Sequence, residues 1–195
     1  MKKLLLVGAV ALCGAMNAQK NTVLVGGNVS YGSAKTTMSG VSSTSDSFSF
    51  NPTVGYQFTD NWTAGVRLGV GTTKDETVTP EKKTNTFQYG VFARYTMPFN
   101  ETFAAYGDFD VYANNGKTTY TTGNVSSTGK TNGFGVMFTP NLFINFKNSF
   151  GLNFNIGGLG YSTEKVKGSD YKVNQFGFEF GKGVTVGISK NFGGK

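Results

Sequence analysis

Two carboxylates spaced two residues apart, Asp108 and Asp110, are the strongest candidates in this chain for acid–base chemistry. Side chains at positions i and i+2 of a β-strand lie on the same face, so both carboxylates can reach one group. The corresponding faces of other predicted strands carry Arg67, Arg94 and Glu179. Because buried charges persist when they are paired and hydrogen-bonded, we interpret the five residues as structural ion pairs inside the fold. A catalytic pair is the alternative.

The residues that many enzymes need are missing from this chain. It contains no His, and its single Cys, Cys13, lies in the N-terminal segment. His-based acid–base catalysis and a Ser–His pair are therefore excluded, and we expect no enzyme, no metal site and no cofactor. The Gly-rich stretch 157–160 is not followed by a helical pattern, so a phosphate-binding loop is not expected. The basic residues are scattered without a recognition motif, which disfavours nucleic-acid binding.

Apolar and polar residues alternate repeatedly along the chain after residue 20. A period of two residues is typical of β-strands with two unlike faces, and no stretch sustains the 3.6-residue period of a helix. The 18 Phe and 9 Tyr agree with an all-β protein. We predict eight strands, at about residues 22–33, 47–58, 62–72, 87–97, 102–113, 133–146, 150–161 and 176–192.

The connections between these strands alternate in length. Three are short, near residues 60, 99 and 147. Four are long and rich in Thr, Ser, Gly and Lys, at 34–46, 73–86, 114–131 and 162–174. This pattern is typical of transmembrane barrels, in which the short turns are periplasmic. The sequence therefore predicts an all-β fold, an eight-stranded antiparallel up-and-down transmembrane β-barrel with four polar extracellular loops.

The chemistry of the two strand faces indicates which face meets lipid. One face is almost wholly Phe, Tyr, Val, Leu and Ile, whereas the other is Gly, Ser, Thr and Asn with the charges named above. Eight strands enclose a space only wide enough for side chains, so the small polar face fits inside and the apolar face points to lipid. A soluble barrel with an apolar interior is the alternative. Outward aromatics beside the short turns are expected to form a periplasmic girdle of Phe58, Trp62, Phe99, Phe103, Phe146, Phe150 and Phe192.

The first 18 residues have the layout of a secretory signal peptide. Lys2 and Lys3 precede an apolar stretch, 4–12, and small residues follow up to Ala18. Cleavage after Ala18 divides the chain into a signal peptide, residues 1–18, and an outer-membrane barrel domain, residues 19–195. Cys13 then leaves with the signal, and Leu12 before it disfavours a lipoprotein anchor.

Two stretches resemble the small outer-membrane β-barrel family of the OmpX and OmpA-transmembrane-domain type. Residues 138–148, followed by Gly157-Gly158-Leu159-Gly160-Tyr161-Ser162, resemble the sixth hairpin of that family. Residues 183–192 resemble the C-terminal strand signal that the barrel-assembly machinery reads, although here residues 193–195 follow the final aromatic. The resemblance implies a porin-like barrel in the outer membrane of a Gram-negative bacterium and that machinery as a partner during biogenesis. It does not imply an activity, because fold does not fix function.

These features favour a monomeric barrel with a structural or surface-interaction role, whose loops meet an external protein or surface ligand. The alternative is a narrow pore or a transporter for ions or small hydrophobic compounds, which a lumen filled by paired charges argues against. Outer-membrane lipid is the expected surrounding. The lysines of the loops are expected to be solvated, with contact to lipopolysaccharide phosphates as the alternative.

Overall fold

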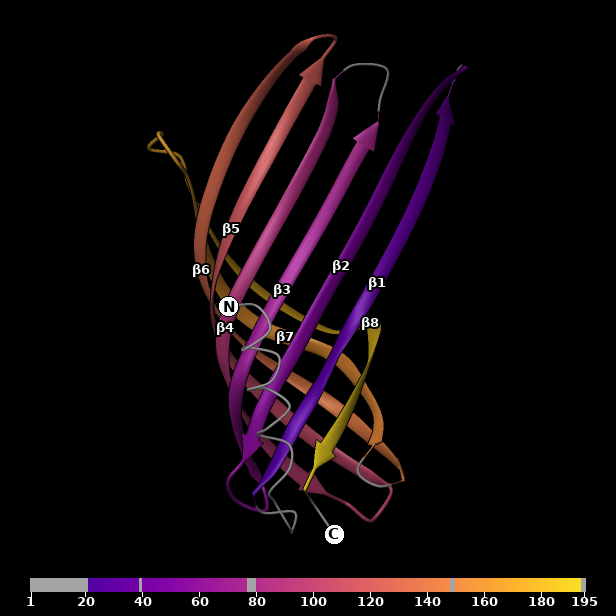
Figure 1. Ribbon diagram of the computed structural model, residues 1–195, viewed down its shortest axis with the longest axis vertical. Helices are drawn as coiled ribbons and strands as arrows, with labels where there is room; N and C mark the ends of the chain where they lie inside the picture. Colours follow the sequence, from indigo (N-terminus) through magenta and orange to yellow (C-terminus); the bar gives the residue numbers. More distant parts are fainter. Residues whose placement is uncertain (1–20, 39, 77–79, 148–149, 194–195) are drawn as a thin grey trace, which may run out of the picture.

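Antiparallel pairing of consecutive strands builds a closed barrel. The computed structural model describes residues 21–38, 40–76, 80–147 and 150–193. Within these ranges eight strands follow one another around the barrel, and β1 pairs with β8 to close it (Figure 1). The predicted all-β, eight-stranded antiparallel barrel is confirmed. The strands are β1 (Thr22–Met38), β2 (Val41–Gln57), β3 (Trp62–Glu76), β4 (Glu81–Pro98), β5 (Phe103–Thr122), β6 (Val125–Lys147), β7 (Phe150–Val166) and β8 (Lys172–Phe192).

Alternation along each strand gives the barrel two unlike surfaces. On β5, Phe103 and Phe109 are 49% and 51% exposed, whereas Ala104, Asp108 and Asp110 are buried in the lumen. The same holds around the barrel, where exposed apolar side chains include Phe50, Val66, Tyr89, Phe138 and Val186. So large an apolar outer surface is what a lipid environment requires, since water-exposed apolar patches on soluble proteins are small. No helix in the described ranges is long and apolar enough to cross a membrane.

The short turns lie at one end of the barrel. The Phe58 N–H donates to the Trp62 carbonyl at 3.1 Å, and the Phe99 N–H donates to the Phe103 carbonyl at 2.9 Å. The turns predicted near residues 60 and 99 are therefore confirmed. The turn predicted near 147 includes residues 148–149, which lie outside the described ranges.

The four stretches predicted as long loops are mostly strand, so that prediction is wrong. The strands are joined instead at residues 39–40, 77–80, 123–124 and 167–171. The abundant Thr favours extended backbone, and hydroxyls pair across the strands, as in Thr84–Thr118 at 3.2 Å and Thr119–Thr128 at 3.3 Å. Polar composition alone does not distinguish a solvated strand from a loop. Each hairpin continues past the apolar surface. We call the four polar segments beyond it, at residues 34–46, 73–86, 114–131 and 162–174, the hairpin extensions.

The pairing of β1 with β8 is confined to the short-turn end. Val23–Gly27 pairs with Ile188–Phe192, and no further pair joins these strands in the described part of the chain. Beyond this point β1 pairs only with β2, up to Met38, and β8 pairs only with β7. The two strands diverge in Figure 1, which leaves an open seam between them. Where they part, Gly27 has a φ of 153°, and a Cβ there would lie 2.5 Å from the Asn51 carbonyl oxygen.

A register shift in β7 changes which residues face outward. The pairing of β7 with β8 is irregular between Asn155 and Gly157, and Gly157 has a φ of 142°. A Cβ at Gly157 would lie 2.1 Å from the Glu179 carbonyl oxygen, so the close approach of β8 requires glycine. Beyond the shift, Tyr161 is 44% exposed, although unbroken alternation predicts it inside the barrel. Strict alternation, which places Tyr161 on the same face as Asn153 and Asn155, therefore fails beyond the shift.

Phe92 is an aromatic side chain that fills the lumen between β2, β3 and β4. It is 3% exposed, and Gly55 and Gly65 leave room for its ring. A Cβ at Gly65 would lie 2.2 Å from the Val54 carbonyl oxygen and 2.7 Å from the Phe92 ring. Both contacts are far below van der Waals distance, so the lumen has no space for a methyl group here.

We expect Gly65→Ala to lower the free energy of unfolding by about 1–3 kcal/mol, because an added methyl overpacks the lumen. Unfolding the barrel with guanidinium chloride in phospholipid vesicles measures this change. Gly129→Ala is the matched control, since a Cβ at that position on β6 meets nothing within 4 Å. Equal losses in the two variants would contradict the packing of Phe92 against Gly65.

Candidate functional site

Four charged side chains meet in the lumen and form its central cluster. Arg94 of β4 binds Asp108 of β5 in a bidentate pair, with its Nε and Nη2 donating at 2.7 and 2.9 Å. Arg67 of β3 donates from Nη2 to the same carboxylate at 2.8 Å and from Nη1 to Asp110. The Arg67 Nε also donates to the Thr53 hydroxyl of β2 at 3.2 Å. Two guanidiniums and two carboxylates thus balance in charge and connect four neighbouring strands.

Aromatic rings surround the guanidiniums of this cluster. The Arg94 guanidinium lies over the Tyr106 ring, 3.7 Å from its centroid. Phe92 is 5.1 Å from the Arg67 guanidinium carbon and 5.7 Å from that of Arg94. Contact with a ring face stabilises a desolvated cation, so the aromatics add to the carboxylates in holding both arginines inside the barrel.

Tyr106 carries the network to the opposite wall of the lumen. Its hydroxyl donates to the Asn153 side chain of β7 at 2.9 Å, and the Asn153 amide donates to Ser189 of β8 at 2.8 Å. Polar side chains from β2, β3, β4, β5, β7 and β8 therefore join one chain of contacts. In the low-dielectric interior, such a connected network fixes the positions of the strands relative to one another.

The cluster separates two cavities within the lumen. One, of about 320 Å³, is lined by residues such as Asn28, Asn51 and Gln88, and the other, of about 180 Å³, is lined by residues beside the short turns. Arg94 and Tyr106 line both cavities. These two side chains stand between the cavities and obstruct the lumen at their level.

Glu179 does not lie with the other predicted charges. The structure brings Arg67, Arg94, Asp108 and Asp110 together, whereas Glu179 is exposed and takes part in none of the ion pairs found among the described residues. It lines a separate cavity of about 960 Å³ beside β7 and β8. The expectation that Glu179 joins the network is wrong, because at Glu179 strand β8 is paired with β7 but no longer with β1, and the side chain is exposed.

The sequence did not identify Phe92, Tyr106 and Asn153 as parts of the network, because their roles depend on the residues that they contact in the fold. Phe92 and Tyr106 stand at inward positions of otherwise small or polar faces, and a bulky aromatic at such a position is a usable signal. Asn153 resembles the other lumen amides in sequence, and only its contacts with Tyr106 and Ser189 distinguish it.

The arrangement suits a structural role better than catalysis. Both oxygens of Asp108 accept hydrogen bonds from guanidiniums, so this carboxylate is not free to take a proton from a substrate. One oxygen of Asp110 is held by Arg67 in the same way. Among the described residues, no group of three or more His, Cys, Asp or Glu could hold a metal ion.

The outer surface carries aromatic residues at the short-turn end. The structure places the seven predicted girdle residues at strand ends or turns of that end. Phe58, Trp62, Phe99, Phe103, Phe146 and Phe150 are exposed, and Phe192 is half-buried opposite Val23. Trp62 packs edge-on against Tyr95 of β4, with ring centroids 5.0 Å apart. Aromatic side chains gathered at one end of the strands match the aromatic girdle of outer-membrane barrels.

A closed barrel with an apolar outer surface and a charged, obstructed lumen defines an integral outer-membrane β-barrel protein. The sequence matches the family described as the outer membrane protein beta-barrel domain over residues 4–193. The chain belongs to this family, which places it in the outer membrane.

Several solved structures are similar to this chain. The attachment invasion locus protein Ail of Yersinia pestis is 16% identical, with a TM-score of 0.48, over 89% of this chain and 99% of that one. A major outer membrane protein from Thermus thermophilus is 14% identical, with a TM-score of 0.48, over 88% and 98% of the two chains. Neisserial surface protein A is 16% identical, with a TM-score of 0.43, over 87% and 97%. No curated protein matches the sequence.

Asp108→Asn is expected to destabilise the barrel by about 3–5 kcal/mol, because it leaves the buried Arg94 guanidinium without its charged partner and removes one of the two carboxylates that the half-buried Arg67 contacts. Unfolding with guanidinium chloride in phospholipid vesicles measures the loss in the free energy of unfolding. The double variant Asp108→Asn with Arg94→Gln removes both partners of the bidentate pair, so its loss should be smaller than the sum of the two single losses. Additive losses would show that the pair makes no energetic contribution as a unit.

Proposed function

We propose that this barrel is a non-enzymatic anchor that presents four polar hairpin extensions at the cell surface for structural or interaction purposes. The length of the strands carries the proposal. A tilted strand needs about 9–11 residues to cross a bilayer, whereas β5 and β6 have 20 and 23 residues. The excess length lies at one end of the barrel, beyond the apolar surface, and forms a paired sheet.

The orientation of the barrel follows from its two ends. The aromatic residues beside the short turns suit a periplasmic girdle, and the hairpin extensions then point outward. Residues 1–18 lie outside the described ranges; their sequence supports export by a signal peptide that is cleaved after Ala18. The strand at 183–192 is proposed to be the segment that the barrel-assembly machinery recognises.

The hairpin extensions offer hydroxyls rather than catalytic groups. Cross-strand pairs such as Thr37–Ser42 at 2.9 Å and Thr121–Ser126 at 3.2 Å hold their tips in register. An ordered polar sheet costs less conformational entropy on binding than a flexible loop does, which favours recognition of an external protein or surface ligand. The obstructed lumen supports this role over that of an open channel.

An epitope tag inserted between Gly123 and Asn124, at the tip of the β5–β6 hairpin, should be labelled by antibody on intact cells. The same tag between Asp60 and Asn61, in a short turn, should be labelled only after the outer membrane is permeabilised. Flow cytometry of both strains measures the difference. Labelling in the opposite order would reverse the barrel and contradict the proposal.

The open seam favours one second candidate, a lateral path for a small hydrophobic compound. The cavity of about 960 Å³ beside β7 and β8 is lined in part by Phe176, Phe178 and Val184. This cavity faces the region where β1 and β8 are not paired.

Planar-bilayer recordings and uptake assays separate the two candidates. The anchor predicts no unitary conductance steps and no accelerated entry of a fluorescent apolar dye into proteoliposomes. Faster dye entry without conductance steps would instead support the lateral path, and clear steps would show an open pore.

A further inference from the structure

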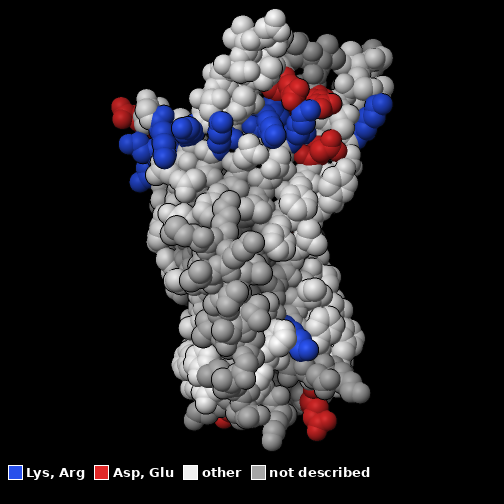
Figure 2. All heavy atoms as spheres, viewed as in Figure 1, with Lys and Arg blue, Asp and Glu red and all other residues white. Residues whose placement is uncertain are grey.

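Lysine recurs at one level on the outer surface. Along the outward-facing positions of each strand, from the middle of the barrel toward the hairpin extension, an apolar residue is followed by a small polar residue and then by a lysine. On β4 this order is Phe87, Asn85, Lys83, and on β6 it is Phe134, Asn132, Lys130. The lysines at this level, here called the lysine belt, are Lys35, Lys74, Lys83, Lys117, Lys130, Lys165 and Lys172. Figure 2 shows basic side chains gathered across this part of the molecule, above a surface that is nearly free of charge.

The strand register places belt lysines directly opposite one another. Lys74 pairs with Lys83, Lys117 pairs with Lys130, and Lys165 pairs with Lys172. Like charges at directly opposed positions destabilise an antiparallel sheet. Anions beside three such pairs, either from the protein or from its surroundings, would offset this repulsion.

The protein supplies anions to one part of the belt. Lys74 contacts Glu76 and also Glu81, the latter at 3.2 Å, and Asp46 of β2 stands opposite Lys74 in register. The hydrogen bond to Glu76, followed by that to Glu81, raises the pKa of Lys74. On this side of the barrel the lysine charge is therefore neutralised internally.

On the β5–β6 hairpin the lysines lack such partners. Neither Lys117 nor Lys130 takes part in an ion pair with the residues that the structure describes. A third lysine joins them, because the Lys167 N–H donates to the Lys130 carbonyl at 2.8 Å. The nearby Glu164 occupies the strand position before Lys165 and so belongs to the other face of β7.

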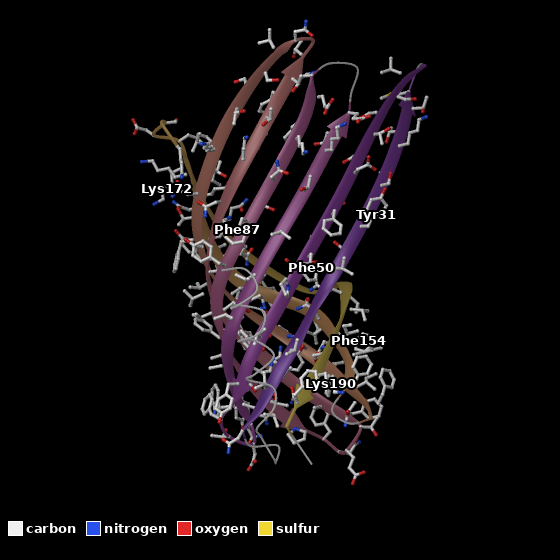
Figure 3. The ribbon with its side chains drawn as sticks, in the orientation of Figure 1. Tyr31, Phe50, Phe87, Phe154, Lys172 and Lys190 are labelled. Carbon is white, nitrogen blue, oxygen red and sulfur yellow. The ribbon has the colours of Figure 1, made fainter. Side chains whose placement is uncertain are left out.

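A groove of about 310 Å³ lies among these lysines. Its lining includes Asn85, Phe87, Asn115, Lys117, Lys130 and Lys167. Phe87 is 44% exposed and lies at the upper limit of the apolar surface (Figure 3). The groove thus brings the side chains of three lysines and two asparagines together with an aromatic side chain that faces the acyl chains of the membrane.

We propose that this groove binds lipopolysaccharide of the outer leaflet through a phosphate group of its lipid A. Lys117, Lys130 and Lys167 hold the phosphate, Asn85 and Asn115 donate hydrogen bonds to it, and an acyl chain packs against Phe87. The position of the groove at the boundary of the apolar surface selects an anion that is joined to hydrocarbon. The inference rests on the outward orientation of the hairpin extensions given under Proposed function.

The test measures binding of fluorescent diphosphoryl lipid A to the purified barrel in detergent micelles. The variant Lys117→Gln with Lys130→Gln should bind about tenfold or more weakly, since each removed lysine contributes attraction to anionic lipid. The matched control, Lys147→Gln with Lys190→Gln, removes two lysines at the short-turn end and should bind as the unmodified barrel does. Unchanged affinity in the groove variant, or an equal loss in the control, would overturn the proposal.

Two further ligands identify what the groove recognises. Dephosphorylated lipid A should bind the unmodified barrel and the groove variant equally weakly, and millimolar inorganic phosphate should not displace the diphosphoryl form. Displacement by inorganic phosphate would show a simple anion site and contradict the lipid assignment.

Heat-modifiable migration of each variant on a gel establishes that it is folded. The epitope-tag experiment reports orientation separately, so a failure of lipid binding is distinguishable from a failure of the proposed function.

Discussion

The need to satisfy every backbone polar group within lipid governs this structure. Hydrocarbon offers no hydrogen bonds, so pairing with neighbours on both sides stabilises a strand that crosses the membrane. Strands β2 to β7 meet this condition, whereas β1 and β8 pair with each other only over Val23–Gly27 and Ile188–Phe192. The eight strands enclose a narrow interior, which side chains must fill. Charged side chains are stable in this interior only when they are paired. The lumen shows such pairing among Arg67, Arg94, Asp108 and Asp110. The obstructed lumen is thus a consequence of closing a small barrel in lipid.

The period-two pattern predicted the number of strands, their order and the outward apolar side chains, because lipid contact imposes one rule on every strand. Of the five charged residues that it placed in the lumen, four lie there together. It failed where the structure departs from strict alternation. The shift at Gly157 turns Tyr161 outward, and the divergence of β8 removes Glu179 from the lumen. The first depends on how closely β8 approaches β7, and the second on where the pairing of β8 with β1, at the other end of the chain, stops. The hairpin extensions were predicted as loops, because Thr and Ser are common in both solvated strands and loops.

Three levels can be distinguished along the barrel axis, each with its own chemistry. Aromatic residues such as Trp62 mark the short-turn end, apolar side chains cover the middle, and lysines such as Lys130 follow before the hydroxyl-rich tips. The lumen follows a separate order, with the charged cluster between two polar cavities. The inner and outer surfaces therefore solve different problems on the same strands. The inner side chains hold the strands together, and the outer side chains match the surroundings at each depth.

Within the described ranges, the seam between β1 and β8 leaves two rows of backbone N–H and C=O groups without a neighbouring strand over the upper part of the barrel. Free edges of this kind invite sheet fusion between molecules in a crowded membrane. Lys35 stands on one edge strand and Lys172 on the other, so two barrels that approach seam to seam bring positive charges together. Electrostatic repulsion of this kind opposes fibre-like growth while the edges remain accessible to a segment of opposite charge.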